Sequence, residues 1–369
     1  ETEVITSEIE QAQFSEGGEN ASCVLVGRPG QVTDPGTPVN EVTLTKVRVL
    51  FDTGNGEGTR PARGNLRPGL AAAGYTPEDV DIVVITHMHG DHCYGLPGLL
   101  ASAQLSGRTE PLTLIGPAAL QPFLQAMMQF AELSLEYELH FVTVENRLQV
   151  WDEQGMKIRC CPLSHRVPSY GYRFEETDIE RTLRVDKLKE EGIPSGPQWR
   201  ELQQGKTVIL ADGRILDGQQ YSQPARKGRV AVIGGDNDQP DLLAELCHHA
   251  DLMVHEATYT QAIAAKVGAG PQHSTAADVA AFAESASLPH LILTHFSPRY
   301  LDKPAASSTR DHQKCLTIDD LRQEAIKEYA GHLCLAEDLE RYTVTRAGQL
   351  MCESLLKRGR SKLRIERDD

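Results

Sequence analysis

One stretch rich in histidine and aspartate decides the fold of this chain: Thr86-His87-Met88-His89-Gly90-Asp91-His92. It directly follows the apolar run 81–85, which predicts a strand that ends in a turn. Such a turn places several side chains in one small volume at the edge of a sheet. Imidazole and carboxylate groups together suit Zn²⁺. The stretch therefore predicts a metal site rather than a chance cluster of histidines on a loop.

Four ligand-type side chains cannot complete two metal sites, so partners are expected further along the chain. His165, Asp236 and His295 each stand at or just after the end of an apolar run that predicts a strand. A single histidine is more often structural than a ligand. The ordered recurrence of His or Asp at strand ends nevertheless indicates one shared site.

The whole sequence predicts a mixed α/β chain without internal repeats. Short apolar runs rich in β-branched residues predict strands at 21–26, 47–52, 82–86, 112–115, 230–234, 252–255 and 291–294. Helices are predicted at 98–104, 117–132, 241–247, 275–285 and 318–329. Thr275 and Asp319 stand at the positions where helix caps are expected.

The composition is that of a globular protein. Of 369 residues, 40% are hydrophobic and 24% are charged. The net charge of −15 excludes a surface that is cationic throughout, but it permits a local basic patch for nucleic acid. The eight cysteines include no CxxC pair, which favours reduced thiols over a disulfide framework.

The sequence also gives an expectation for the compartment. It contains no apolar run near the roughly 18 residues of a membrane helix, so we expect no membrane partner. Residues 1–18 are acidic and polar, unlike a secretory signal or a transit peptide. We therefore expect a cytoplasmic location.

Two segments differ from the rest in composition. Residues 175–206 carry many charges of both signs and the string Gly192-Ile193-Pro194-Ser195-Gly196-Pro197. They predict an inserted short helix with a Pro- and Gly-stiffened loop, and composition alone leaves open whether it has a function. The basic end, 356–367, predicts a solvated helix or a disordered tail.

The order of the predicted ligands resembles that of the metallo-β-lactamase superfamily. The resemblance implies an α/β (α+β) fold, an αββα four-layer sandwich. It implies two Zn²⁺ ions per subunit, one held by His87, His89 and His165 and the other by Asp91, His92 and His295, with Asp236 between them. Two close metal ions lower the pKa of a water molecule and stabilise charge on phosphorus, which favours hydrolysis.

Further motifs resemble one family of this superfamily, ribonuclease Z, the tRNA 3′-processing endoribonuclease. The matching strings are His255-Glu256-Ala257-Thr258, His273-Ser274-Thr275, Leu96-Pro97-Gly98-Leu99-Leu100, Gly171-Tyr172 and His295-Phe296-Ser297-x-Arg299-Tyr300. The inserted segment is similar to the family's flexible arm through Leu188, Leu202, Gly205 and the Gly-Pro string. The resemblance runs from about Val47 to Val344.

This resemblance implies a zinc endoribonuclease that removes 3′ trailers from precursor tRNA and leaves a 3′-hydroxyl. The arm would bind the tRNA away from the active site through Gly196 and Pro197. A homodimer is implied, because in the family the arm of one subunit serves the site of the other. The implied domains are an N-terminal segment at 1–46, a catalytic domain at 47–345 with the arm at about 176–206, and a basic tail at 346–369.

Cleavage of RNA with a 3′-hydroxyl product requires a proton for the departing oxygen, so a general acid is expected opposite the nucleophile. His273 is the candidate, oriented by Glu256, and Asp91 would accept a proton from the attacking water. His255 is either a phosphate contact or a buried supporting residue. Arg299 is either a phosphate contact or part of a structural ion pair.

Three places depart from the family pattern. The usual FLGTG strand and PxKxRN loop are not visible, and only Asn20 resembles the end of that loop. The motif at 52–60 is two residues longer than usual, and Asn237 replaces the usual Thr after Asp236. These departures concern recognition of the RNA 3′ end, including a CCA terminus, rather than the metal site.

Two other functions remain open at this point. A relative that has lost the loop for the RNA end would hydrolyse a small phosphodiester or another ester. A non-catalytic RNA-binding homologue is less consistent with a complete set of ligands.

Overall fold

A computed structural model of the chain contains two compact units. The main unit comprises Glu1–Phe174 and Val230–Asp369, and the inserted unit comprises Glu175–Arg229. The structure describes residues 2–8, 22–27, 48–53, 70–71, 74–145, 148–153, 155–178, 180–225, 227–301, 316–337, 340–345 and 347–354. Asn20, the motif residues 54–60 and the basic tail from 355 onward lie outside this description.

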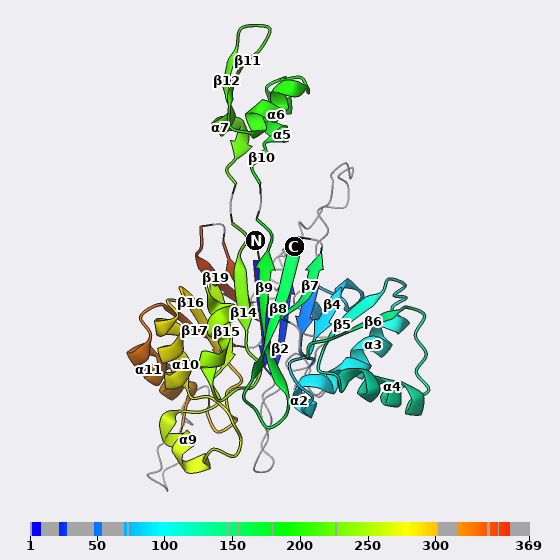
Figure 1. Ribbon diagram of the computed structural model, residues 1–369, viewed down its shortest axis with the longest axis vertical. Helices are drawn as coiled ribbons and strands as arrows, with labels where there is room; N and C mark the ends of the chain where they lie inside the picture. Colours follow the sequence, from blue (N-terminus) through cyan, green and yellow to red (C-terminus); the bar gives the residue numbers. More distant parts are fainter. Residues whose placement is uncertain are drawn as a thin grey trace, which may run out of the picture. The chain divides into compact units, whose positions relative to one another are not determined.

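An eight-stranded sheet forms one half of the main unit (Figure 1), in the order β19-β18-β1-β2-β3-β4-β5-β6. The run from β3 to β6 is parallel, and the pairs β1–β2, β2–β3, β1–β18 and β18–β19 are antiparallel. The strands are β1 (Thr2–Glu8), β2 (Ser22–Gly27), β3 (Arg48–Phe51), β4 (Ile82–Val84), β5 (Leu112–Gly116), β6 (Leu139–Thr143), β18 (Glu340–Val344) and β19 (Leu350–Ser354).

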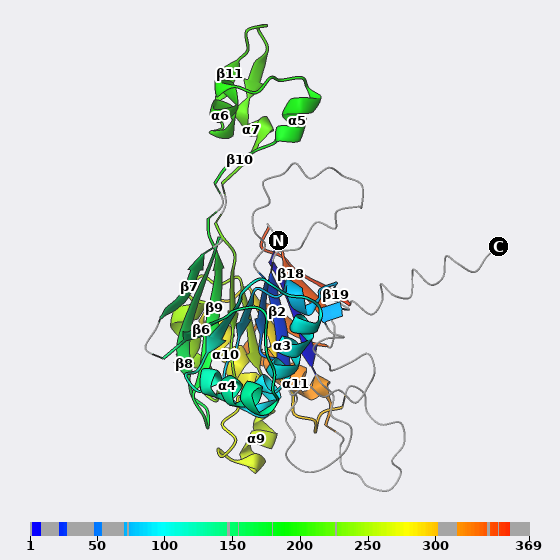
Figure 2. The same ribbon diagram turned by 90° about the vertical axis from the view of Figure 1, so that its right-hand side faces the viewer.

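A seven-stranded sheet forms the other half, in the order β17-β16-β15-β14-β9-β8-β7. Its strands β14 to β17 are parallel, and β7 and β8 form an antiparallel pair. Figure 2 shows β7, β8 and β9 in a different layer from β2, β18 and β19. The strands are β7 (Gln149–Glu153), β8 (Met156–Leu163), β9 (Ser169–Glu176), β14 (Val230–Ile233), β15 (Leu252–Glu256), β16 (His290–Thr294) and β17 (His332–Leu335).

Helices lie on the outer faces of both sheets. On the first sheet they are η1 (Pro77–Asp79), α2 (Gly90–Cys93), α3 (Gly95–Leu105) and α4 (Leu120–Phe130). The other helices of the main unit are η2 (Pro240–Leu243), α8 (Ala244–Cys247), α9 (Gln261–Val267), α10 (Ala276–Ser285) and α11 (Ile318–Glu328). Figure 1 shows α3 and α4 on one outer side of this unit and α10 and α11 on the other.

Three hydrophobic clusters explain the layers. Val49 and Phe51 point between the sheets and join a cluster with residues of β9, β14 and β15, whereas Leu50 points outward among α3 and α4. A third cluster packs Val232 and Met253 against α10 and α11. Successive side chains of a strand point to opposite faces, so each sheet has one face in the central core and one under helices. The predicted αββα sandwich of the metallo-β-lactamase fold is therefore confirmed.

The inserted unit has its own small core. It contains β10 (Thr182–Leu183), α5 (Val185–Glu190), α6 (Pro197–Gln203), β11 (Thr207–Ile209), β12 (Ile215–Asp217), α7 (Gly218–Tyr221) and β13 (Ser222–Gln223). Leu188, Leu202, Val208 and Leu216 are buried together there. The unit continues past the predicted segment 176–206 by a β-hairpin and α7, which the sequence analysis did not anticipate.

Most predicted elements of the main unit are present. A strand lies within or across each of the seven predicted ranges. Thr275 caps α10, because its side chain accepts a hydrogen bond from Asp278 N. The predicted cap at Asp319 is wrong: Thr317 is the N-cap of α11, in a capping box with Asp320, and Asp319 lies in the first turn. Among the described residues, no helix has the length and apolar character needed to span a membrane.

Candidate metal centre

The predicted ligands all lie where strands of the two sheets end. His87 to His92 follow β4, His165 follows β8, Asp236 follows β14 and His295 follows β16. Asp236 and His295 follow parallel strands of one sheet, which end at the same edge, whereas His87 to His92 follow a strand of the other sheet. The packing of the two sheets therefore brings these side chains together. The structure brings all seven predicted residues into two adjoining groups.

The first group contains three imidazoles and one carboxylate oxygen. His89 Nδ1 lies 3.0 Å from His87 Nε2 and 3.2 Å from His165 Nε2. Asp236 Oδ2 lies 3.6 Å from both His87 Nε2 and His165 Nε2. Ligands about 2.1 Å from a tetrahedral zinc ion lie roughly 3.4 Å from one another, so this spacing fits Zn²⁺.

The second group has the same spacing. His92 Nε2 lies 3.5 Å from Asp91 Oδ2 and 3.5 Å from Asp236 Oδ1. His295 Nε2 lies 3.8 Å from Asp91 Oδ2 and 3.7 Å from Asp236 Oδ1. The two oxygens of Asp236 thus face different groups, as a bridging carboxylate requires.

Buried ligand atoms without hydrogen bonds support a cation in this place. Within the described residues, Asp91 Oδ2, His92 Nε2 and Asp236 Oδ2 are buried and have no hydrogen-bond partner. Leaving a buried polar atom unsatisfied is costly, and leaving a charged one unsatisfied costs more. A metal ion at each group would satisfy these atoms, so the residues fit the expected ions.

One carboxylate orients ligands of both groups. Asp52 Oδ2 lies 2.8 Å from His92 Nδ1 and also accepts the hydroxyl hydrogen of Thr86 across 2.8 Å. Thr86 Oγ1 lies 2.9 Å from His87 Nδ1, and its own hydrogen is already given to Asp52, so it accepts from His87. Both imidazoles therefore carry hydrogen on Nδ1, and Nε2 of each is the nitrogen that faces its ligand group.

Similar bonds orient the two later histidines. His165 Nδ1 donates to the carbonyl oxygen of Gln272 across 2.9 Å. His295 Nδ1 lies 3.1 Å from Thr258 Oγ1, whose hydroxyl lies 2.6 Å from Glu256 Oε2 and donates to it. Each bond places a ring hydrogen on Nδ1, so Nε2 is the nitrogen that faces the ligand group.

Glu256 and His273 form a buried pair beside both groups. His273 Nδ1 lies 3.0 Å from Glu256 Oε1, and the His273 ring lies 5.1 Å from the His165 ring and 5.5 Å from the His295 ring. Glu256 also accepts hydrogen bonds from three backbone N–H groups, those of Asn237, Thr258 and Ser274. These hydrogen bonds fix the position of the Glu256 carboxylate, which in turn holds the His273 ring in one orientation.

His255 and Asn237 lie behind this pair. His255 is fully buried, its Nδ1 donates to the Glu256 carbonyl across 2.7 Å, and its Nε2 lies 3.3 Å from Asn237 Nδ2. Burial lowers the pKa of His255. Since both ring nitrogens are occupied, the structure favours the supporting role over a phosphate contact. Asn237 Oδ1 accepts from Ser164 N, so the replacement of Thr by Asn links the His165 loop to His255.

The histidines of the two ligand groups differ in the direction in which their pKa values are shifted. Burial lowers the pKa of His87, His89 and His165, with neighbouring positive groups adding to the effect. In the second group burial acts in the same direction, but Asp236 and Asp91 outweigh it. They raise the pKa of His92 well above its ordinary value and that of His295 to about 9.

The backbone is strained at several of these residues. Asp52, Gln272 and His295 have φ angles of 53°, 56° and 56°, a region that residues other than Gly seldom occupy. At Gly235 a Cβ atom would lie 2.8 Å from Thr86 Cβ, so only Gly lets the Asp236 loop approach the Thr86 turn this closely. Such strain is typical of functional sites.

The predicted substrate contacts lie in different places. Arg299 is exposed on the loop after His295, and its guanidinium donates to Ser297 Oγ across 3.1 Å. No carboxylate among the described residues lies within ion-pair distance of Arg299, which favours the phosphate-contact alternative. Gly196 and Pro197 lie at the start of α6 in the inserted unit.

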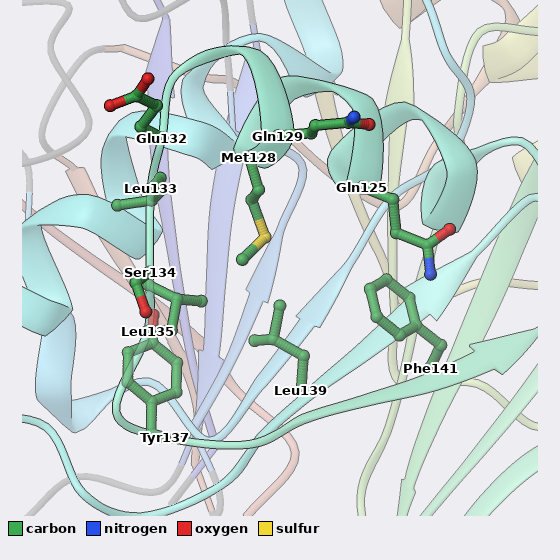
Figure 3. A pocket seen from close by; sticks show the side chains of 10 residues that line it. All are labelled: Gln125, Met128, Gln129, Glu132, Leu133, Ser134, Leu135, Tyr137, Leu139 and Phe141. Atoms are coloured by element: carbon green, nitrogen blue, oxygen red, sulfur yellow. The ribbon is translucent and has the colours of Figure 1, made fainter.

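A larger groove elsewhere does not mark the active site. It has a volume of about 550 Å³ and lies between α4, the turn after it and β6 (Figure 3). Its lining residues include no histidine, and Glu132 is the one acidic residue among them. The cavity behind His92, Asp236 and His295 measures only about 20 Å³. The ligand chemistry, rather than the size of a pocket, locates the site.

Four residues that support the ligands were not predicted as site residues from the sequence: Asp52, Thr86, Thr258 and Gln272. The sequence does contain a signal for Asp52, because Asp52 is the last residue of the predicted strand 47–52 and the predicted ligands also stand at the ends of strands. The sequence contains no signal for Gln272, since this residue contributes only its backbone carbonyl oxygen.

Comparisons with known proteins agree with this geometry. Residues 47–183 match the Beta-lactamase superfamily domain. The chain is 42% identical over 325 residues to ribonuclease Z of Pseudomonas putida (strain GB-1), which covers 86% of this chain and 97% of that protein. It is 40% identical to ribonuclease Z of Marinobacter nauticus, with 86% and 96% covered.

Solved structures show the same fold. Human tRNase Z, short form, superposes with a TM-score of 0.54 at 21% identity, over 93% of this chain and 99% of that chain. A long form RNase Z from yeast gives 0.53 at 14% identity, over 98% of this chain and 43% of that chain. Together with the sequence identity to its relatives, this places the chain in the ribonuclease Z family, hydrolases with the metallo-β-lactamase fold.

Proposed function

We propose that this protein removes 3′ trailers from precursor tRNA by hydrolysing one phosphodiester and leaving a 3′-hydroxyl on the tRNA. The observation that carries the proposal is the pair of ligand groups joined by Asp236, in a chain that matches ribonuclease Z over 86% of its length. A cytoplasmic location remains the expectation from the sequence.

The protein would bind two zinc ions. His87, His89 and His165 would hold one, and Asp91, His92 and His295 would hold the other, with Asp236 between the two groups. When bound, two such ions supply a nucleophile from water at neutral pH and neutralise charge on the phosphorus under attack.

Asp91 would act on the nucleophile as well as serve as a ligand. Its carboxylate stays ionised, because His92 and His295 hold its pKa below the ordinary value despite burial. An ionised carboxylate suits the role of a metal ligand, and by the family resemblance Asp91 would also accept a proton from the attacking water. Asp91→Ala should therefore lose activity together with at least part of the metal.

His273 would protonate the departing oxygen. Its Nδ1 lies 3.0 Å from Glu256 Oε1, which fixes the orientation of the ring beside both ligand groups. Glu256 would act through His273: it fixes the ring and stabilises the imidazolium form that donates the proton. Burial works against ionisation of Glu256, but the charge of His273 and the hydrogen bond to it keep the pKa of Glu256 below its usual value.

The inserted unit would supply the contact that distinguishes a tRNA from a small ester. Within 175–229 the numbers of acidic and basic residues are equal, so the net charge of −15 belongs to the rest of the chain. A neutral unit approaches a polyanion at lower electrostatic cost than the acidic main unit does. Gly196 and Pro197 would lie in the contact region, and Arg299 would bind a phosphate near the metal centre.

Mapping the cleavage product tests the function. The full chain is incubated with a precursor tRNA, with and without a chelator, and the 3′ end of the product is sequenced. We expect cleavage at the 3′ side of the mature tRNA, a 3′-hydroxyl end and loss of activity with the chelator. Hydrolysis of bis-p-nitrophenyl phosphate without any tRNA cleavage would replace the proposal with the small-ester alternative.

Deletion of the inserted unit tests its role. Glu176 N donates to the carbonyl oxygen of Arg229 across 2.9 Å, so a Gly-Ser-Gly linker can replace 178–227. We expect this variant to lose cleavage of precursor tRNA and to retain hydrolysis of bis-p-nitrophenyl phosphate. Cleavage of precursor tRNA at the wild-type rate would contradict the role of the unit.

We also propose a homodimer in which the inserted unit of one subunit serves the metal centre of its partner. A mixing experiment tests this directly. The deletion variant has an intact metal centre, and Asp91→Ala has an intact inserted unit, so mixed dimers should regain activity on precursor tRNA. Sedimentation gives the oligomeric state, and a monomer or an absence of complementation would contradict the arrangement.

A further inference from the structure

An exposed aromatic residue lies just after the ligand stretch and has no role in the proposed hydrolysis. Tyr94 lies between α2 and α3, two residues after the proposed ligand His92, and 59% of its surface is exposed. Consecutive Cα atoms are 3.8 Å apart, so the Cα atoms of these two residues lie within about 8 Å of each other.

The protein holds this ring in place from two sides. A Cβ atom at Gly90 would lie 2.5 Å from Tyr94 Cε2, so the ring packs against the ligand stretch itself. On another side it stacks on Phe123, with ring centroids 6.2 Å apart and planes at 16°. The exposed ring is thus oriented before any ligand arrives, and binding would cost little conformational entropy.

The position of the pair along the sheet matches that of the metal centre. Phe123 lies in the first turns of α4, which follows the carboxyl end of β5. The ligand stretch follows the carboxyl end of β4, which is parallel to β5. In open α/β sheets, ligands bind beyond the carboxyl ends of the strands. Tyr94 and Phe123 therefore stand at the edge of the sheet where a substrate of the metal centre would lie.

We propose that Tyr94 is a stacking platform for a nucleobase next to the scissile phosphate. The inference rests on the proposed function, because it requires an RNA substrate. Single-stranded RNA presents a flat base beside each phosphate, and base stacking on aromatic side chains is a common way for proteins to bind it. Stacking would fix the nucleotide and thereby the position of its phosphate over the metal centre.

The experiment tests whether the effect of substituting Tyr94 depends on the presence of the stacked base. Tyr94→Ala, Tyr94→Phe and wild type are compared on precursor tRNA that is either unmodified or abasic at the last tRNA nucleotide or the first trailer nucleotide. Stacking of one base contributes about 1–3 kcal/mol, so Tyr94→Ala should lower kcat/KM on unmodified RNA at least fivefold. Tyr94→Phe keeps the ring and should remain within about twofold of wild type.

The abasic substrates distinguish loss of base stacking from a structural effect of the Tyr94 substitution. With the base removed at the stacked position, wild type should slow down to the level of Tyr94→Ala, and the substitution should then have no further effect. Phe130→Ala is the matched control, since Phe130 is an aromatic residue at the end of α4 with 86% of its surface exposed. It should cleave the unmodified RNA at the wild-type rate.

Several results would overturn the proposal. An equal loss in Tyr94→Ala on unmodified RNA and on both abasic substrates would show a structural effect, as would a lower zinc content. A change in sedimentation would assign the ring to contact with a second copy of the chain. Wild-type kcat/KM in Tyr94→Ala would exclude stacking. Failure of the wild type to cleave unmodified RNA would instead overturn the proposed function, and the stacking inference with it.

Discussion

Asp52 accepts a hydrogen bond from His92 Nδ1 across 2.8 Å, although forty positions separate the two residues in the chain. The same carboxylate accepts from the Thr86 backbone N–H and hydroxyl and, through that hydroxyl, positions His87. His92 and His87 belong to different ligand groups. A single buried residue therefore orients one ligand of each proposed zinc ion.

The first prediction concerns this carboxylate. Asp52→Asn keeps the shape of the side chain and tolerates the positive φ angle, but it removes the charge that fixes the imidazole tautomers. Loss of such a partner lowers metal affinity about 10- to 100-fold. Competition with a chromogenic chelator measures the zinc affinity. Asp81→Asn is the matched control, because Asp81 Oδ2 accepts from Arg48 N at the opposite end of β4. An unchanged affinity in Asp52→Asn would contradict the orienting role.

The second prediction is that zinc binding to the metal-free protein releases protons at pH 7.5. Asp236 and Asp91 raise the pKa of His92 well above its ordinary value and that of His295 to about 9, so both are protonated before binding. Burial lowers the pKa of His87, His89 and His165, so these are already neutral. Since a ligand nitrogen must be bare, about two protons should leave, and affinity at the second group should rise with pH up to about 9.

Calorimetry in buffers of different ionisation enthalpy counts these protons. The apparent binding enthalpy should change with the buffer by an amount that corresponds to proton release. His295→Ala is the matching variant, and it should release about one proton fewer. Identical enthalpies in all buffers would show that the second group is neutral before zinc binds.

The third prediction separates acid catalysis from metal binding. His273→Ala should retain both zinc ions and cleave precursor tRNA about 10²- to 10⁴-fold more slowly, the usual contribution of a general acid. The loss should be smaller on bis-p-nitrophenyl phosphate, because p-nitrophenolate leaves without a proton. Glu256→Gln should move the activity in the same direction, since Glu256 orients the ring. An equal loss on both substrates would remove His273 as the acid.

The sequence predicted the side chains that cluster better than it predicted the groups that support them. His87, His165 and His295 stand in a recognisable order just after predicted strands, and the packing of the two sheets brings them together. The supporting contacts depend on the fold: Gln272 contributes a carbonyl oxygen that any residue has, and Thr258 matters through the direction of one hydroxyl. The start of α11 is a different case, because Asp319 and Thr317 are both suitable caps and the local capping box of Thr317 with Asp320 decides between them.

The inserted unit was predicted in part for a related reason. The Gly-Pro string is a local signal, whereas the hairpin of β11 and β12 has only the alternation of buried Val208 and Leu216 with exposed Ile209 and Ile215. Three-residue strands give too short a pattern for the period of two to be recognised. Their pairing depends on the small core around Leu188 and Leu202, which appears only once the unit is folded.

The fourth prediction concerns the ion pair at the base of the inserted unit. Arg229 binds both carboxylate oxygens of Glu176, across 2.7 and 2.8 Å, and both side chains are buried. Removing one partner of a buried pair leaves a desolvated charge and costs about 3–5 kcal/mol. Glu176→Gln should therefore raise amide hydrogen exchange across 175–229 while zinc content stays at the wild-type level. Arg214→Ala breaks an exposed pair with Asp212 and should change the exchange little, since such pairs contribute at most about 1 kcal/mol. Equal exchange in the two variants would show that the pair does not stabilise this unit.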